Sequence, residues 1–235
     1  MKFDFALKTL SGDTAVRQAT RGNRVFDAIR QAIVQLQLRP GNLLSEAEVA
    51  RQLGVSRQPV REAFIKLGEV GLVEVRPQRG TFVVMISKRE VQNARFIREA
   101  IEVAVARKAA LEATPEQIAT LRAIIERQRE TAASGNHGVF LELDEAFHEA
   151  LAHSADCDHA WRVLENLKAQ MDRVRWLSMP DATPFETLIA QHTAIVDAIE
   201  QHSPEAAEAA VRAHLGEILT SLPRLAAQHP DLFTD

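Results

Sequence analysis

The sequence predicts a mainly α-helical protein with an N-terminal winged helix-turn-helix and a C-terminal antiparallel α-helical bundle. Helix starts, a glycine turn and two β-branched segments follow one another between residues 44 and 84, whereas Ala, Glu, Arg and Leu with helical periodicity dominate after Met85. Charge divides at the same place. Residues 1–87 hold 13 Lys and Arg against 8 Asp and Glu, and residues 88–235 hold 15 against 24. The positive part is therefore the one suited to nucleic acid.

Length and composition allow two domains, each with its own core. The chain has 235 residues, of which 46% are hydrophobic and 26% charged. The single cysteine, Cys157, excludes an internal disulfide, and Asp4 and Lys8 interrupt the first residues before a signal-peptide core could form. No apolar run approaches bilayer length. We therefore expect a cytoplasmic protein with no membrane partner.

The expected helix-turn-helix consists of two short helices on either side of Gly54. Ser45, followed by Glu48, begins the first helix with a capping box, and Ser56 caps a second helix expected over Arg57–Glu69. Gly54 lies where the chain must bend sharply, and this bend needs a residue that tolerates positive φ.

The second of these helices has a polar face in its N-terminal half. Its apolar residues return at helical spacing and bury the other side: Val60, Ala63, Phe64, Leu67 and Val70. Arg57, Gln58 and Arg61 therefore point away from the core, in the part that meets base edges when such a helix enters the major groove. The alternative is a solvated helix face, but the basic hairpin that follows favours nucleic-acid reading.

That hairpin is expected from strands over 72–76 and 81–85. They are joined through a turn that contains Arg79, so the wing has a basic tip beside the duplex. The residues expected to contact DNA are Ser45, Ser56, Arg57, Gln58, Arg61 and Arg79.

Residues 25–84 resemble the winged-helix regulators of the GntR superfamily, and the run GVSRQPVREAF is the most specific part of the match. The resemblance implies phosphate and base contacts from Arg57 and Arg61, with the wing tip reaching toward the minor groove. Gln78 stands where relatives have a wing glycine.

The rest of the chain is expected to be helical. Its expected helices are 88–112, 115–134, 138–154, 158–178, 184–201 and 204–221. Thr114 and Thr183 each begin a capping box followed by Pro, and Ser203 precedes Pro204 at a further start. The expected domains are an N-terminal arm over 1–20, the winged helix-turn-helix over 21–86, a helical domain over 87–222 and a C-terminal tail over 223–235.

Polar residues on the inward faces of three helices are the anomaly of this domain. His192 and His214 each lie in an apolar stripe, and Asp144 and His148 share one edge of a third stripe. A single inward histidine is usually a hydrogen-bonded core residue. Three imidazoles and a carboxylate in one core, however, can hold Zn²⁺, Ni²⁺ or Mn²⁺ and leave coordination positions for a ligand.

Arg98 also lies on an inward face. A buried guanidinium needs an anion, which is either a carboxylate of the bundle or the carboxylate of a ligand beside the metal. Arg95, by contrast, is expected to pair at the surface with Glu99 and Glu102, whose face it shares.

Most of residues 90–220 resemble the all-helical, FCD-type effector domain of the FadR-like branch of the GntR superfamily. The resemblance rests on FHEALAHS around His148, on RFIREAIE around Arg98, and on the spacing of four residues: Asp144, His148, His192 and His214. It implies one divalent metal ion per chain, held by those four residues, and a small carboxylate effector bound beside it.

The expected function is a metabolite-responsive transcriptional repressor that is not an enzyme. A single winged helix buries little DNA surface, so we expect a homodimer on palindromic operator DNA, controlled by a small organic or sugar acid. Two alternatives stay open. One is a metal-dependent hydrolase, since the metal set could activate water, although no general base or nucleophile motif is recognisable. The other is a regulator whose metal is purely structural.

Overall fold

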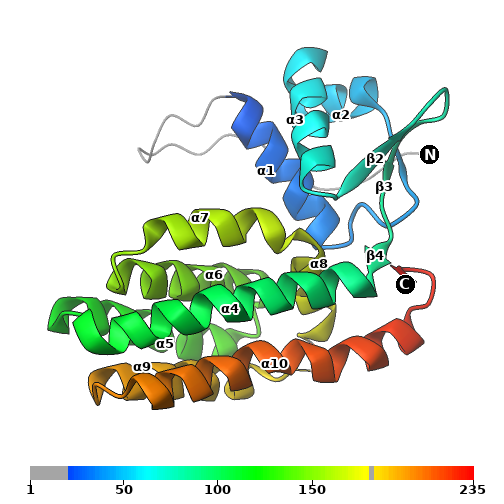
Figure 1. Cartoon of the computed structure of the whole chain (residues 1–235). Coiled ribbons are helices and arrows are strands. Elements are labelled where there is room, and N and C mark those ends of the chain that lie inside the picture. The colour runs from blue at the N-terminus through cyan, green and yellow to red at the C-terminus, as the bar shows by residue number, and fades with distance from the viewer. Residues whose placement is uncertain (1–20, 180–182) are drawn as a thin grey trace. The chain divides into compact units, whose positions relative to one another are not determined.

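The computed structural model describes residues 21–179 and 183–235, so the arm expected over 1–20 lies outside the described residues. The described chain forms two compact units, which Figure 1 shows together. The first holds residues 21–87 and 229–235, and the second holds the remaining described residues between 88 and 228. The first contains a helix-turn-helix with a small antiparallel sheet and the second is helical, which confirms the predicted fold class.

The helices of the first unit pack around a small apolar core. They are α1 (Arg21–Val34), α2 (Glu46–Leu53) and α3 (Arg57–Glu69), and α3 has the bounds that were expected. Both α1 and α2 pack against α3. The core side chains include Val25, Ile29, Ile33, Val60, Phe64 and Leu67. Burial of this face turns the opposite side of α3 toward solvent.

The turn of the motif forms as expected, with one difference in its capping. Gly54 has φ 65°, and Ser45 accepts a hydrogen bond from the Glu48 backbone N–H at 3.4 Å. The other half of the expected capping box is absent, because the Glu48 carboxylate binds Arg51 at 2.5 Å instead. Ser56 is the N-cap residue of α3, but its side chain makes no capping hydrogen bond.

The wing is an antiparallel hairpin of β2 (Val73–Arg76) and β3 (Gly80–Val83). Its strands are shorter than expected, and β1 (Leu43–Leu44) adds an antiparallel neighbour on the other side of β3. Two wing residues have positive φ, Gln78 at 59° and Gly80 at 108°. Gln78 therefore adopts a left-handed conformation in the wing turn. This is the position at which the family resemblance leads us to expect glycine.

The last residues of the chain also belong to the first unit. β4 (Ile86–Ser87) pairs in parallel with β5 (Phe233–Thr234). The loose tail expected from 223 is therefore wrong. α10 (Pro204–Gln228) runs past its expected end and through Pro223, because Leu222 and Leu225 continue its buried stripe.

The helices of the second unit mostly match the expected ones. They are α4 (Lys88–Glu112), α5 (Pro115–Ser134), α6 (His137–Ser154), α7 (Asp158–Leu167), α8 (Ala169–Ser178), α9 (Phe185–Glu200) and α10. The capping box at Thr114 is confirmed. The one expected at Thr183 does not form, because Pro184 has ψ 146° and is the N-cap residue itself.

The helix expected over 158–178 is broken at Lys168. This residue has ψ −2°, far from the value of a regular α-helix. Its buried ammonium contacts the Glu145 carboxylate on α6 and lies 3.1 Å from that of Asp172 on α8. The break therefore lies where a buried charge meets carboxylates from two helices.

The second unit is a helical bundle. α10 packs against α4 and α9, and α5 packs against α6 and α9. The turns between α5 and α6 and between α9 and α10 span only two and three residues, so these neighbours are antiparallel. α6, α9 and α10 all contribute to one buried core. Within the described residues, no helix combines the length and apolar character needed to cross a bilayer.

Candidate metal centre and nucleic-acid interface

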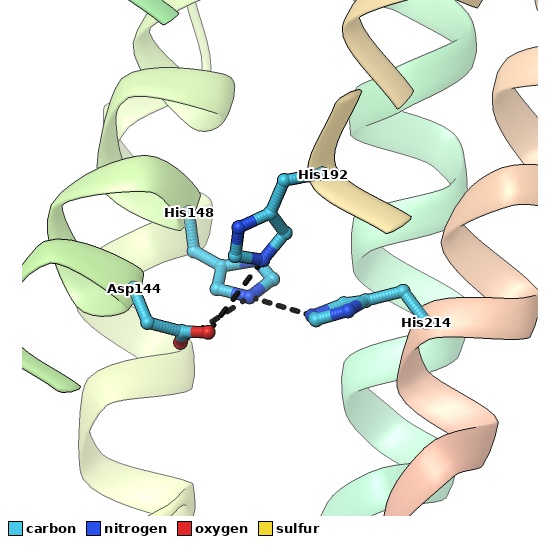
Figure 2. Close-up of side chains that lie close together, drawn as sticks. All are labelled: Asp144, His148, His192 and His214. Atoms are coloured by element: carbon cyan, nitrogen blue, oxygen red, sulfur yellow. Dashed lines mark hydrogen bonds and ion pairs between the residues drawn. The ribbon is translucent and has the colours of Figure 1, made fainter. Parts of the chain in front are cut away.

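The four expected metal ligands come together in the core of the helical bundle. Asp144 and His148 lie one turn apart on α6, His192 lies on α9 and His214 on α10. One oxygen or nitrogen of each lies within 4.8 Å of those of the others, and all four residues are buried. Figure 2 shows the three rings and the carboxylate pointing toward one another.

Each imidazole is held from behind by a polar side chain of another helix. Nδ1 of each ring lies within hydrogen-bond distance of an oxygen, in three pairs: His148 with Glu102 (2.6 Å), His192 with Gln128 (2.9 Å) and His214 with Gln191 (3.0 Å). Amide oxygens only accept hydrogen bonds, so Nδ1 of His192 and Nδ1 of His214 carry the proton in their pairs. Nδ1 of His148 meets Glu102 in an ion-pair contact that makes no hydrogen bond. Nε2 of His192 and Nε2 of His214 therefore present a lone pair to the centre, the orientation that metal-binding histidines take.

Acceptor atoms of His192, His214 and Asp144 therefore meet at the centre. Nε2 of His148 and Nε2 of His214 are 3.1 Å apart, and Nε2 of His192 lies 3.5 Å from Oδ1 of Asp144. Among the described residues, that Oδ1 and that Nε2 have no hydrogen-bond partner. Buried lone pairs at such distances repel one another unless a cation lies among them. Three nitrogens and a carboxylate fit a divalent ion such as Zn²⁺.

Burial keeps the centre in the protonation state that binds metals. Desolvation lowers the pKa of His192 to about 3 and the pKa of His214 well below its usual value. Burial by itself raises the pKa of Asp144, but the Arg175 guanidinium that contacts it, together with the histidines, holds this pKa below its usual range. At neutral pH the cluster therefore offers neutral His192 and His214 imidazoles and an ionised carboxylate.

Arg98 pairs with a carboxylate of the bundle, which is one of the two partners considered for it from the sequence. Its Nε lies 2.6 Å from Oε1 of Glu102, and this buried pair uses the carboxylate that also holds His148. Its Nη2 has no hydrogen-bond partner among the described residues. The surface pair expected between Arg95 and Glu102 is wrong. Arg95 pairs with Glu99, while Glu102 follows Arg98 by one helical turn and is buried with it.

A small, partly open pocket lies beside the metal centre. It is lined by residues of α4, α8, α9 and α10 and of the segment between α8 and α9: Arg98, Met171, Arg175, Ser178, Met179, Thr183, Leu188, His214, Leu215, Glu217, Ile218 and Ser221. His214 belongs to both the pocket and the metal cluster. A small ligand in the pocket would therefore lie against the centre.

Each charged group of the pocket is linked to one of the metal ligands. The links are Arg175 to Asp144 directly, Arg98 through Glu102 to His148, and Glu217 through Gln191 to His214. In the last of these, Gln191 Nε2 donates to Glu217 at 3.2 Å, and its Oε1 accepts from His214 at 3.0 Å. The pocket and the metal centre therefore share one hydrogen-bonded framework.

Several of these supporting residues were not recognised in the sequence. They are Glu102, Gln128, Arg175, Gln191 and Glu217. Two carried a readable signal, because Glu102 follows the inward Arg98 by four residues and Gln128 continues the buried stripe of Leu121 and Ile125. We find no comparable local signal for Arg175, whose partner Asp144 lies on another helix.

The residues expected to contact DNA all lie exposed on the first unit. They are Ser45, Ser56, Arg57, Gln58, Arg61 and Arg79. Arg57 lies 3.5 Å from Glu46 in an exposed ion pair, and Gln58 donates to Glu62 at 2.9 Å. Because both contacts are exposed, they can be exchanged for contacts to a duplex at small cost.

Both units match known protein families. The model described as bacterial regulatory proteins, gntR family, matches residues 21–83, and the model described as FCD domain matches residues 94–217. The chain is 43% identical over 212 residues to the HTH-type transcriptional repressor RspR of Escherichia coli (strain K12), across 90% of this chain and 93% of that protein.

Two further proteins are similar over most of their length. An uncharacterized HTH-type transcriptional regulator in an unstable DNA locus of Streptomyces ambofaciens is 35% identical over 215 residues, across 91% of this chain and 90% of that protein. The solved structure of E. coli McbR/YncC superposes with a TM-score of 0.75 at 21% identity, across 90% of this chain and 100% of that chain, and shows the same fold.

Proposed function

Because the chain belongs to the gntR family of bacterial regulatory proteins and carries an FCD domain, it is a DNA-binding transcriptional regulator of the FadR-like branch, and we propose that it represses its target genes. The similar E. coli protein is named as a repressor, which supports this direction. The relatives are transcriptional regulators and not enzymes, so the hydrolase alternative is wrong. DNA binding would place its work in the bacterial cytoplasm.

We propose α3 as the helix that reads bases and the β2–β3 wing as a phosphate contact. Arg57, Gln58 and Arg61 are exposed on the side of α3 that faces away from its core, as major-groove reading requires. The Ser56 hydroxyl makes no capping bond and is free to donate to a phosphate, and Ser45 and Arg79 lie exposed nearby in the motif and wing. Useful affinity needs two such heads, so the operator would be palindromic and the protein a homodimer.

The helical unit would bind one divalent ion, Zn²⁺, Ni²⁺ or Mn²⁺, through Asp144, His148, His192 and His214. The observation that supports this proposal is that four buried residues each place one ligand atom within 4.8 Å of the others, and that Asp144 Oδ1 and His192 Nε2 have no hydrogen-bond partner among the described residues. The ion would supply the positive charge that compensates these acceptors and attracts an anionic ligand.

The effector would be a small organic or sugar acid bound in the pocket. Arg98 Nη2 is buried there without a partner among the described residues, and a guanidinium in that state is suited to a carboxylate. Arg98 lies on α4, which begins at Lys88 directly after β4 of the first unit. Binding would therefore shift the helix that continues into the DNA-binding unit and change operator affinity.

Fluorescence anisotropy with a labelled fragment of the promoter upstream of the gene would test this function. The metal-loaded protein should bind with sub-micromolar, salt-sensitive affinity, and an acid from a panel of hydroxy and sugar acids should change that affinity. Arg98→Lys keeps the charge but loses the fork, so it should bind the fragment normally and fail to respond to the acid. A structural metal alone would show as unfolding on chelation with no acid response from the wild-type protein.

A further inference from the structure

Glu217 is the only acidic side chain among the described residues that line the pocket. It lies three residues after His214 on α10 and therefore on nearly the same face of the helix. Its Oε2 accepts a hydrogen bond from the neutral amide of Gln191 at 3.2 Å. Within the described chain, no Lys or Arg forms an ion pair with it, so no cation of the protein offsets this carboxylate in the pocket.

The two guanidiniums of the pocket, by contrast, each have a carboxylate partner. Arg98 is paired with Glu102 and Arg175 with Asp144. When a divalent ion is added to these two ion pairs and to Glu217, one net positive charge is left. One ligand carboxylate cancels that charge. A second carboxylate would leave an excess negative charge in a mostly buried site beside Glu217.

The two serines that line the pocket add a second constraint. Ser178 Oγ donates to the Arg175 carbonyl oxygen at 2.9 Å, and Ser221 Oγ donates to the Ile218 carbonyl oxygen at 3.2 Å. Their hydroxyl protons are therefore used within their own helices, and only their lone pairs are left for a ligand. Together with Glu217 they give the pocket acceptors for ligand hydroxyls.

We propose that Glu217 determines specificity, so that the pocket accepts a polyhydroxy monocarboxylate and rejects the corresponding dicarboxylate. The ligand carboxylate meets Arg98, and hydroxyls at the other end donate to Glu217 and to the serine oxygens. This inference rests on the proposed carboxylate effector and adds the chemistry of the end remote from the carboxylate.

Calorimetry with paired sugar acids tests the assignment. Aldonic and aldaric acids of five and six carbons share their hydroxyls and differ at one end, which is a hydroxymethyl group in the first and a carboxylate in the second. Metal-loaded wild-type protein should bind one of the aldonates at least about tenfold more tightly than its aldarate. Glu217→Gln should reduce this ratio about tenfold or more, because the aldarate no longer meets a like charge.

Glu205→Gln is the matched control. It removes the same charge from α10, but Glu205 is exposed and pairs with Arg107 outside the pocket. The aldonate-to-aldarate ratio should therefore stay at its wild-type value. Metal content is measured in every variant. The side-chain amide introduced by Glu217→Gln would still offer an oxygen to Gln191, so this variant should keep its ion.

Each outcome separates the inference from the proposed function. An unchanged ratio in Glu217→Gln, equal binding of both acids by the wild type, or loss of metal from the variant would overturn the role of Glu217 while leaving a carboxylate effector in place. Tighter binding of an amino acid than of any aldonate would overturn the hydroxyl assignment. If the wild type bound no acid of the panel, the proposed effector class would fall, and the inference with it.

Discussion

At the scale of single residues, the metal centre depends on side chains that serve two neighbours at once. Glu102 is 3% exposed and contacts both Arg98 and His148. Burial by itself raises the pKa of Glu102, but the Arg98 guanidinium and His148 hold it below its usual range. The carboxylate therefore stays ionised, and its 2.6 Å contact with Nδ1 places Nε2 of His148 on the side of the metal cluster.

Replacing one ligand should remove the metal. The purified protein is expected to carry about one divalent ion per chain, and His148→Ala should lose most of it because the remaining ligands no longer surround the ion. Elemental analysis after gentle purification measures the content. His153→Ala is the control, since His153 lies on the same helix with an exposed side chain. Wild-type protein that neither carries nor takes up an ion would show that the cluster is a structural core.

At the scale of elements, α3 and the β2–β3 wing divide the work of DNA binding. α3 buries one face and presents arginines on the other, whereas the wing depends on two positive φ angles for its turn. The two elements therefore respond to different kinds of substitution.

In α3, Arg61→Ala should cost about 1–3 kcal/mol of specific operator binding if its guanidinium reads a guanine, and discrimination should relax at one base step. Anisotropy titrations with operator variants measure both effects. Arg39→Ala is the control, because Arg39 is an exposed arginine of the same unit that pairs with Asp231. Equal weakening on every sequence would make Arg61 a phosphate contact, and unchanged affinity would place base reading elsewhere.

In the wing, Gly80→Ala should lower the free energy of unfolding of the first unit by about 1–2 kcal/mol, since an L side chain at φ 108° is strained. The added Cβ would also lie 2.6 Å from Leu43 Cδ1. Gly68→Ala is the matched control, because a Cβ there has only an ordinary contact and lies within α3. It should raise stability by about 0.5–1 kcal/mol. Chemical denaturation measures the free energy of unfolding of both variants. If both substitutions changed it in the same direction, this account would be contradicted.

At the scale of the whole molecule, the two units have different sources of stability. The first unit has an apolar core, whereas the core of the helical unit surrounds the buried cluster of Asp144, His148, His192 and His214, which we propose to hold a metal ion. A metal ion that binds only the folded state stabilises it by an amount that depends on its concentration, about 4 kcal/mol at a thousand times the dissociation constant.

Removal of the metal should therefore destabilise the helical unit selectively. Chelation should increase amide hydrogen exchange in α6, α9 and α10 and leave α3 near its original rate. Mass spectrometry on peptides from both units measures this, with added Zn²⁺ as the reversal control. If exchange rose equally in both units, or in neither, the cluster would not be the source of this stability.

The sequence by itself determined the features that depend on the spacing of nearby residues. The bounds of α3 to α5, the turn at Gly54 and the inward positions of Asp144, His148, His192 and His214 all follow from caps and from the helical repeat. These features depend on residues a few positions apart, and such residues are neighbours in any helix.

Only the tertiary structure decided which distant groups meet. The break at Lys168, the pairing of β5 with β4 and the inward turn of Glu102 each depend on a partner far along the chain. The oxygen that contacts Nδ1 of each imidazole and the position of Glu217 in the pocket also depend on partners far along the chain. A repeat of 3.6 residues shows which face of a helix is buried, but the group it meets there is set by the packing of separate helices.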